Sequence, residues 1–288
     1  MSAVATAADP WTERRRRVAE LRARQPFARE VLDFYGALLP VQQNAFSNAQ
    51  SDSPPVDRLA AYVAEVVVPS VLDASMAAGP ERMRSALIER LEREQPHSII
   101  ERWMRGEEQP AIDRFLARAS MGPVLEALGP DSRAGCAGTR DARHCPQCGG
   151  APQLDYFAPA GEDLATGRRY LLCARCSTSW GYARMTCAAC GEDSTTKLPI
   201  YAEEGTASGE HGSVVRGLPA PSTNGRHAAV FPHMRIEACD SCRHYLLSID
   251  LATDPNAVPV VDEIAAIPLD LYARDRGFTK ITTNLAGF

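Results

Sequence analysis

The stretch "HCPQCGG" at residues 144–150 contains two cysteines separated by two residues and followed directly by glycine. One such unit is ambiguous, because redox catalysts, haem attachment sites and metal sites share this spacing. Three more units follow: "CARC" at 173–176, "CAAC" at 187–190 and "CDSC" at 239–242. In each unit a tight turn can direct both thiolates toward one point, and two facing turns complete a tetrahedral shell of sulfurs. These eight cysteines therefore predict two metal ions.

The residues around the four units indicate which units share a metal. "CPQCGG" and "CAACGE" place glycine after the second cysteine, where the turn favours a positive φ angle, whereas "CARCS" and "CDSCR" do not. Strand-like runs, "RRYLLC" and "HYLLSID", accompany the units without glycine. This alternation is typical of a tandem repeat. We therefore expect a first site of Cys145, Cys148, Cys173 and Cys176, and a second site of Cys187, Cys190, Cys239 and Cys242.

Two other chemistries of paired cysteines fit the sequence less well. Disulfides are disfavoured by the fourfold repetition and by a cytoplasmic setting, where thiols stay reduced. Thioredoxin-type catalysis needs a strand, the motif and a helix in succession, and no unit has these neighbours. Four thiolates suit zinc and iron alike, so the ligands alone leave the metal open.

Other potential ligands near the units are expected not to bind metal, because four sulfurs already complete each shell. His144 is predicted to be a bystander. Cys136 lies in a segment without periodicity and is interpreted as an incidental thiol, or alternatively as a redox-sensitive or exchangeable extra ligand. The insertion at 203–233 is rich in Gly, Ser and Pro and is expected to form a loop. Its histidines are expected to be surface residues: His211, His227 and His233.

The first 135 residues contain no cysteine and have the periodicity of helices. Asp9-Pro10 is a typical helix start, and apolar residues then recur at three- and four-residue spacing before Pro40. A last amphipathic run at 111–128 is expected to break or bend near Gly122-Pro123. We predict an all-α domain of about five to seven helices. Near the other end, "VDEIAAIPLDLYARDRGF" at 261–278 predicts a helix with Ile264, Ile267 and Leu271 on one face.

The charge and the hydropathy of the chain exclude several classes of function. A net charge of -5 and a pI near 5.7 give no global positive field, so nucleic acid is not the expected partner. The arginine run at 14–24 is interrupted by acidic residues and is interpreted as a solvated helix face. No apolar run approaches the length of a membrane span and no signal peptide is evident. We expect a cytoplasmic protein without membrane insertion.

Longer motifs resemble the FdhE-type formate dehydrogenase accessory proteins of bacteria. These motifs are "CPQCGGAPQ", "GRRYLLCARCSTSW", "ARMTCAACGE", "MRIEACDSCRHYLLSID" and "DPNAVPVVDEIAAIPLDLYARDRGF". A looser similarity covers "RVAELRARQPFAREVLDFYGALLPVQQ" and "FLARASMGPVLEAL" in the first half. The resemblance implies a helical N-terminal domain and two rubredoxin-like modules, with iron favoured over zinc at the eight cysteines. It also implies binding to the catalytic subunit of a molybdenum- or tungsten-dependent formate dehydrogenase, which needs such a protein to become active.

The expected fold is multidomain: an all-α N-terminal domain, two small rubredoxin-like (zinc-ribbon-like) β metal-binding modules and a C-terminal helix. The expected boundaries are 1–130 for the helical domain, 131–143 for a linker, 144–182 and 183–250 for the modules, and 251–288 for the C-terminal helix and tail. The sequence contains no Gly-rich phosphate loop, no His-Glu-x-x-His and no serine nucleophile elbow, so we expect no enzyme. Two alternatives stay open: an iron redox protein or oxygen sensor acting in cofactor insertion, and a zinc-ribbon adaptor for nucleic acid or protein. The sequence indicates no oligomeric state.

Overall fold

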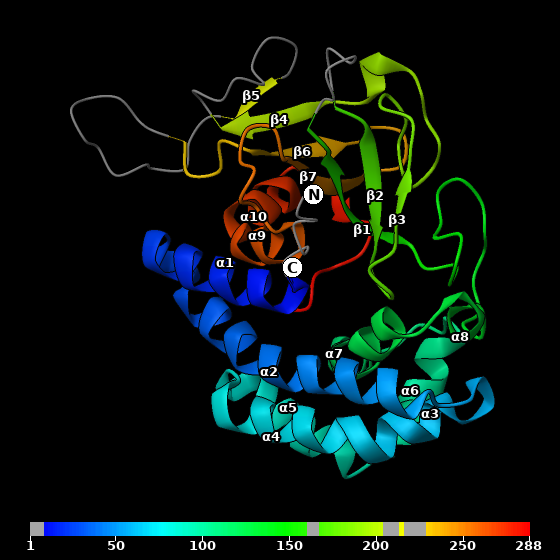
Figure 1. Ribbon diagram of the computed structural model, residues 1–288. Coiled ribbons are helices and arrows are strands. Elements are labelled where there is room, and N and C mark those ends of the chain that lie inside the picture. The colour runs from blue at the N-terminus through cyan, green and yellow to red at the C-terminus, as the bar shows by residue number, and fades with distance from the viewer. Residues whose placement is uncertain (1–8, 160–166, 204–212, 216–228) are drawn as a thin grey trace, which may run out of the picture.

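A computed structural model describes residues 9–159, 167–203, 213–215 and 229–288. Helices make up the chain as far as residue 134, and the strands lie after residue 151 (Figure 1). The helices of the first part are α1 (Pro10–Arg24), α2 (Arg29–Asp52), α3 (Leu59–Tyr62), α4 (Val68–Ala78), α5 (Glu81–Leu91), α6 (Pro96–Met104), α7 (Ala111–Ala127) and α8 (Pro130–Ala134). The all-α prediction for the first part of the chain is confirmed.

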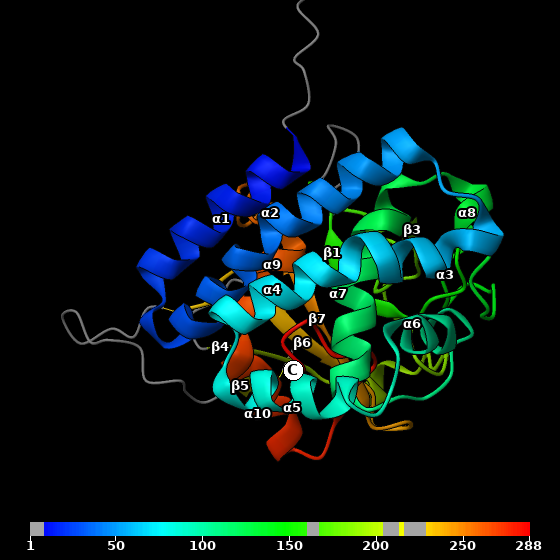
Figure 2. The same cartoon turned by 90° about the horizontal axis from the view of Figure 1, so that it is seen from below.

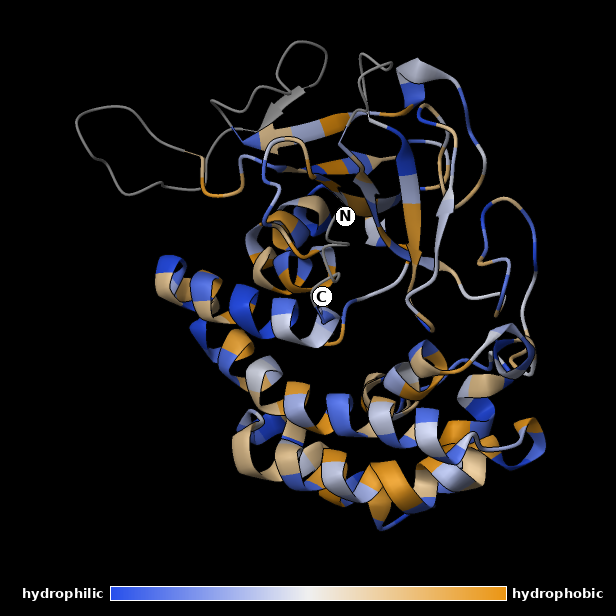
Figure 3. Ribbon diagram, in the orientation of Figure 1, coloured by the Kyte–Doolittle hydropathy of each residue, from blue (hydrophilic) through white to orange (hydrophobic). Residues whose placement is uncertain are grey.

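The helical part is built around the packing of α2 against α7, with α1 and α4 on either side of α2 (Figure 2). Hydrophilic and hydrophobic residues follow each other along these helices, as expected when one side of a helix faces a core (Figure 3). The predicted helix start is confirmed, because the Asp9 carboxylate accepts hydrogen bonds from the N–H groups of Trp11 and Thr12.

Two prolines lie inside helices, one of them at Gly122-Pro123, where we expected a break or bend. Helix α2 continues past Pro40, and α7 runs through Pro123 without a break. A proline in a helix interior loses one backbone hydrogen bond and costs roughly 3 kcal/mol. Both helices bury apolar side chains on either side of the proline, including Leu39 of α2 and Val124 of α7, and this packing offsets the cost.

The helical stretch Val56–Ala78 is long and apolar enough to cross a membrane by length and composition. This corrects the expectation that no apolar run approaches the length of a membrane span. One side of this stretch packs into the helical core. The residues concerned are Leu59, Val63, Val67 and Val71, all of which are buried. The core of a protein and a lipid bilayer select the same residue types, and here the apolar side faces α2 and α7.

The strands form two repeats of the same unit. β1 (Pro152–Phe157), β2 (Arg169–Cys173) and β3 (Ser179–Gly181) are antiparallel neighbours in this order. β4 (Ile200–Glu203), β6 (Met234–Ala238) and β7 (His244–Asp250) repeat the arrangement. In each repeat one Cys-x-x-Cys unit precedes the first strand and the other joins the second and third strands. This order matches the tandem repeat that the sequence indicated.

The two repeats share one sheet rather than forming two independent modules. Among the described residues the order is β3-β2-β1-β7-β6-β4-β5, with β5 (Ser213–Val215) at one edge and β8 (Thr279–Lys280) beside β7. The repeats meet where β1 pairs in parallel with β7. At this junction Arg169 of the first repeat lies 2.5 Å from Asp155 and 2.7 Å from Glu237 of the second repeat. Burial raises the pKa of Asp155 to about 7.

The C-terminal segment is not the single helix that we predicted. It forms α9 (Pro259–Ala265) and α10 (Ile267–Asp275), separated at Ala266, and then β8. Ile264 is buried against α1 and α2, whereas Leu271 is 47% exposed, so the common face predicted for these two residues is wrong. Proline in the first turn of each helix, Pro259 of α9 and Pro268 of α10, favours two short helices over one long one.

The arginine run of α1 is not a solvated face at two of its positions. Arg14 is buried and pairs with Glu126 of α7 at 2.7 Å. Arg17 is fully buried, and its guanidinium lies 2.5 Å from Asp262 of α9 and 2.7 Å from Asp254. His233 donates or accepts a further hydrogen bond at 2.8 Å to the same Asp262 carboxylate. The periodicity of the sequence gave no sign of these ion pairs. Those of Arg17 join α1 to α9, which lies beside it (Figure 1).

Replacing Arg17 with alanine should therefore destabilise the whole chain. The change leaves the carboxylates of Asp254 and Asp262 without their guanidinium partner, and loss of one partner of a buried ion pair costs about 3–5 kcal/mol. Arg16→Ala on the exposed side of the same helix is the matched control, with an expected cost of about 0–1 kcal/mol. Urea unfolding of the metal-loaded proteins measures both. Equal stabilities for the two variants would contradict this role of Arg17.

Candidate metal centres

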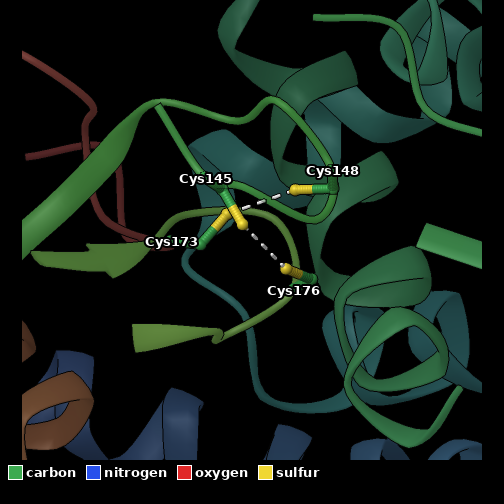
Figure 4. A group of neighbouring side chains, drawn as sticks. All are labelled: Cys145, Cys148, Cys173 and Cys176. Atoms are coloured by element: carbon green, nitrogen blue, oxygen red, sulfur yellow. Dashed lines mark hydrogen bonds between the residues drawn. The ribbon is translucent and has the colours of Figure 1, made fainter. Parts of the chain in front are cut away.

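The cysteines that we predicted as ligands lie in two clusters of four. In the first cluster, Cys145 and Cys148 come from the turn before β1, and Cys173 and Cys176 come from the turn between β2 and β3 (Figure 4). The Sγ atoms of Cys145 and Cys176 are 3.7 Å apart, and those of Cys148 and Cys173 are 3.4 Å apart. All four side chains are buried.

The second cluster repeats this arrangement with the other four cysteines. Cys187 and Cys190 precede β4, and Cys239 and Cys242 lie in the turn between β6 and β7. The Sγ atoms of Cys187 and Cys242 are 3.7 Å apart, and those of Cys190 and Cys239 are 3.8 Å apart. The structure thus brings together the same groups of four that the repeat pattern suggested.

These separations match a metal shell and not disulfides. A disulfide needs a sulfur–sulfur distance of about 2.05 Å, far shorter than any distance in either cluster. Four sulfurs at about 2.3 Å from a central ion form a tetrahedron with edges of roughly 3.8 Å. Within each cluster all four sulfurs lie within 4.8 Å of one another. Each cluster can therefore hold one metal ion, and the two can hold two.

The four turns share one backbone geometry, including the two turns without glycine. The residue after the second cysteine has a positive φ angle in every turn: Gly149 at 69°, Ser177 at 57°, Gly191 at 82° and Arg243 at 60°. Only glycine adopts this conformation without steric cost, so Ser177 and Arg243 are strained by the turn. Backbone N–H groups also point at the sulfurs, as Arg175 N–H does to Cys173 at 3.3 Å and Ala189 N–H does to Cys187 at 3.4 Å.

The thiols of each cluster lie so close together that their pKa values shift in different directions. Hydrogen bonds from Cys148, Cys173 and Cys176 hold the pKa of the Cys145 thiol well below its usual range, and the same contact with Cys145 raises the pKa of Cys148. In the second cluster burial opposes the ionisation of Cys190, yet hydrogen bonds from the Glu192 N–H group and from the other sulfurs lower its pKa. In each cluster these contacts ease the ionisation of one thiol, and a metal ion binds thiolates and displaces the remaining protons.

The two clusters differ in their surroundings. The first cluster lies in the main core of the helical part, and Arg175 of its second turn stacks on Trp103 of α6 with 5.3 Å between guanidinium and ring centroid. The same guanidinium donates to the Ala137 carbonyl at 2.7 Å. The second cluster lies against the sheet alone, and there Cys190 is exposed and Cys242 is partly exposed. Solvent therefore reaches the second cluster and not the first.

The other cysteine and the histidines outside the clusters have structural contacts. Cys136 is 1% exposed in the core that holds the first cluster, and burial raises its pKa, so it is not a loose thiol of a linker. His144 bonds to Asp141 at 2.7 Å and takes no part in the shell. His233 is buried, which corrects its interpretation as a surface histidine. His211 and His227 lie outside the described residues.

A third group of potential ligands is occupied by a cation of the chain itself. One ligand atom from each of His233, Asp254 and Asp262 lies within 4.8 Å of the others. The Arg17 guanidinium contacts both carboxylates, so its positive charge stands where a metal ion would. This group was not predicted. Its only sign in the sequence is the acidic segment "DPNAVPVVDE" next to a buried helix start.

Metal content should follow the two clusters. Protein purified without oxygen is expected to contain two ions per chain, and Cys148→Ser or Cys242→Ser should each remove one, because a missing thiolate opens one shell. Cys136→Ser, a buried cysteine outside both shells, is the matched control and should retain two. Elemental analysis by mass spectrometry gives the counts. Two ions in Cys148→Ser, or a lost ion in Cys136→Ser, would count against the assignment.

A chelator should empty the second cluster before the first. The exposed Cys190 lets a competing ligand approach that metal, while the first metal is reached only after local opening of the helical core. Release of metal into a coloured chelator should therefore show a fast and a slow phase of equal amplitude. The fast phase should vanish in Cys242→Ser, and a fast phase that persists in this variant would reverse the order.

Sequence comparisons place the cysteine-containing part among known proteins. Residues 144–184 match the family described as "FdhE, central domain", and residues 222–286 match "FdhE, C-terminal domain". The first match contains the first cluster, and the second match contains Cys239 and Cys242 of the second cluster.

Curated relatives and a solved structure agree with these matches. A "Protein FdhE homolog" of Aquifex aeolicus is 29% identical over half of this chain and 42% of its own length. A "Protein FdhE homolog" of Pseudomonas aeruginosa is 33% identical over 49% of this chain and 38% of its own length. The matched part therefore spans about two fifths of these relatives.

The crystal structure of the FdhE protein from Pseudomonas aeruginosa has a similar fold, with a TM-score of 0.60 at 22% identity, covering 97% of this chain and 96% of that one. That likeness concerns the fold alone and includes the helical part, which lies outside both family matches. Two segments of the chain, residues 144–184 and 222–286, are thus similar to the central and C-terminal domains of the FdhE family.

Proposed function

We propose that this protein is an accessory factor that binds the catalytic subunit of a molybdenum- or tungsten-dependent formate dehydrogenase and is needed for its activity. The observation that carries the proposal is the coincidence of the FdhE domain matches with the two clusters of four cysteines. The protein would act by binding and not by catalysis. We place it in the cytoplasm, where clustered cysteines stay reduced and bind metal.

We further propose that all eight cysteines of the clusters are metal ligands, in two rubredoxin-like modules at 144–182 and 183–250. The 131–143 segment would link them to the helical domain at 1–130, with 251–288 packed against both. Iron is the favoured metal, by resemblance to the family, and zinc is the other metal that suits four thiolates. Iron would supply one-electron redox chemistry, whereas zinc would be structural.

The exposed second cluster is the feature through which such a protein could sense its partner or its surroundings. Cys190 and Cys242 reach solvent, so a docking subunit can cover this cluster without any change in the helical part. The same exposure favours the second candidate function, an iron redox protein or oxygen sensor acting during cofactor insertion. Electron transfer falls off with distance, and an exposed cluster can approach a partner centre closely.

Deletion of the gene in its host is expected to abolish formate oxidation, and the wild-type gene should restore it. Cys136→Ser should restore it equally, while Cys242→Ser, which opens the second shell, should restore little. A tagged wild-type protein should co-purify with the formate dehydrogenase catalytic subunit. Unchanged formate oxidation in the deletion strain would reject the accessory role.

The metal in anaerobically purified protein separates the two candidate functions. Ferric four-thiolate sites have charge-transfer absorption bands that zinc sites lack, so the spectrum distinguishes the metals directly. A redox role requires iron in at least the second cluster. Redox-silent zinc in both clusters, together with full restoration of formate oxidation, would leave the accessory role and remove the redox one.

A further inference from the structure

A cavity of about 730 Å³ lies between helices α5 and α7 and the C-terminal segment that follows α10. The segment runs beside α7 and α5, where Figure 2 shows it in red. The Arg118 guanidinium of α7 donates to the Thr283 carbonyl at 2.5 Å and so holds the two walls together. Cavities of this size hold small molecules in other proteins. No part of the accessory role proposed above uses this cavity.

Four arginines from three different elements line the cavity: Arg82 of α5, Arg114 and Arg118 of α7, and Arg175 of the turn after β2. Their hydrogen bonds go to neutral oxygens, such as the Gln109 carbonyl for Arg114 at 2.8 Å. Within the described ranges, no ion pair joins any of the four to a carboxylate. The neighbouring Arg90 and Arg102, by contrast, both pair with the buried Asp113.

The charges around the cavity leave an excess of positive charge. Besides the four arginines, the lining contains Lys280 and one acidic residue, Glu108. Lys280 contacts two carboxylates behind the wall, Glu263 at 2.7 Å and Asp270 at 3.0 Å. Glu263 also attracts the half-buried Arg118. Five basic side chains therefore face three carboxylates, so basic side chains outnumber acidic ones around the cavity.

A buried donor without a partner also lines the cavity. Asn284 is 4% exposed, and its Oδ1 accepts hydrogen bonds from the N–H groups of Ala286 at 3.0 Å and Phe288 at 3.1 Å. These two bonds fix the orientation of the amide. Its Nδ2 group has no hydrogen-bond partner in the structure. Buried amide N–H groups are seldom left unpaired, so this residue is an exception in the wall of the cavity.

One part of the cavity wall is apolar. Met83 of α5 and Ile112 and Phe115 of α7 contribute to it, together with Trp103 of α6. A ligand that consisted only of a small inorganic anion would leave these side chains in water. The cavity is therefore matched by a molecule with both a charged group and an apolar or aromatic part.

We propose that this cavity binds a small molecule that carries phosphate together with an apolar or aromatic group. The planar guanidinium fork pairs with phosphate in bidentate geometry. A phosphate monoester carries roughly -1.5 to -2 charges at pH 7 and several acceptor oxygens, so it can pair with more than one guanidinium, whereas a carboxylate carries one charge. The proposal is independent of the formate dehydrogenase role, so each can fail without the other.

Calorimetric titration of the metal-loaded protein tests the proposal with three probes: ADP, inorganic pyrophosphate and adenosine. ADP should bind most tightly, because it offers both phosphate and an aromatic base. Pyrophosphate should bind more weakly, and adenosine weakest of all. Binding of ADP should weaken with rising salt, as expected for pairing with arginines. Pyrophosphate binding as tightly as ADP would overturn the role of the apolar wall.

The double variant Arg82→Gln/Arg114→Gln should weaken ADP binding by roughly ten- to a hundredfold, since charge-assisted hydrogen bonds are lost. Both side chains are exposed, so their loss should not unfold the chain. Arg84→Gln, on the same helix but outside the lining, removes one like charge and should leave the affinity unchanged. Absence of ADP binding, an equal loss in Arg84→Gln, or tighter binding of a glutamate-rich peptide than of ADP would each overturn the proposal.

Discussion

The convergence of four thiolates on one point is the constraint on which the second half of this structure depends. Each cluster joins a turn before the first strand of a repeat to the turn between its second and third strands, so closing a shell aligns the strands. Strands of three to seven residues bury too little apolar surface to stabilise such short repeats alone. A metal ion bound in each cluster would therefore supply free energy of folding. Ser177 and Arg243 keep their strained conformations because each turn must place both of its cysteines in the cluster.

Buried ion pairs determine how the helical part sits on the sheet. Arg17 reaches from α1 to Asp262 of α9, and Arg169 ties the first repeat to Glu237 of the second. Such pairs specify one arrangement of the elements, because any slip would leave a charge buried without a partner. The first cluster is consequently enclosed by helices, while the second remains open to solvent. The two clusters thus contain the same residue type but differ in solvent exposure, because different elements surround them.

The sequence predicted the features that rest on local spacing. The cysteine repeat, the cap at Asp9 and the helical first half follow from short-range geometry, and the structure has them. Predictions that depended on distant partners were wrong. Arg17 has the spacing of a surface residue and is fully buried, and His233 lies in a polar segment yet contacts Asp262. A break or bend was expected near Gly122-Pro123, but α7 continues there, and its packing against α2 outweighs the lost hydrogen bond.

By itself the sequence predicted which eight cysteines lie together and how they divide into two clusters of four, because two residues between cysteines favour a turn whatever the rest of the chain does. Only the tertiary structure decided that β1 pairs with β7 in one continuous sheet, that Cys190 faces solvent, and that four arginines meet around one cavity. These features arise from residues far apart in the chain. Their positions depend on which buried charges and apolar faces find partners, and no local pattern encodes that choice.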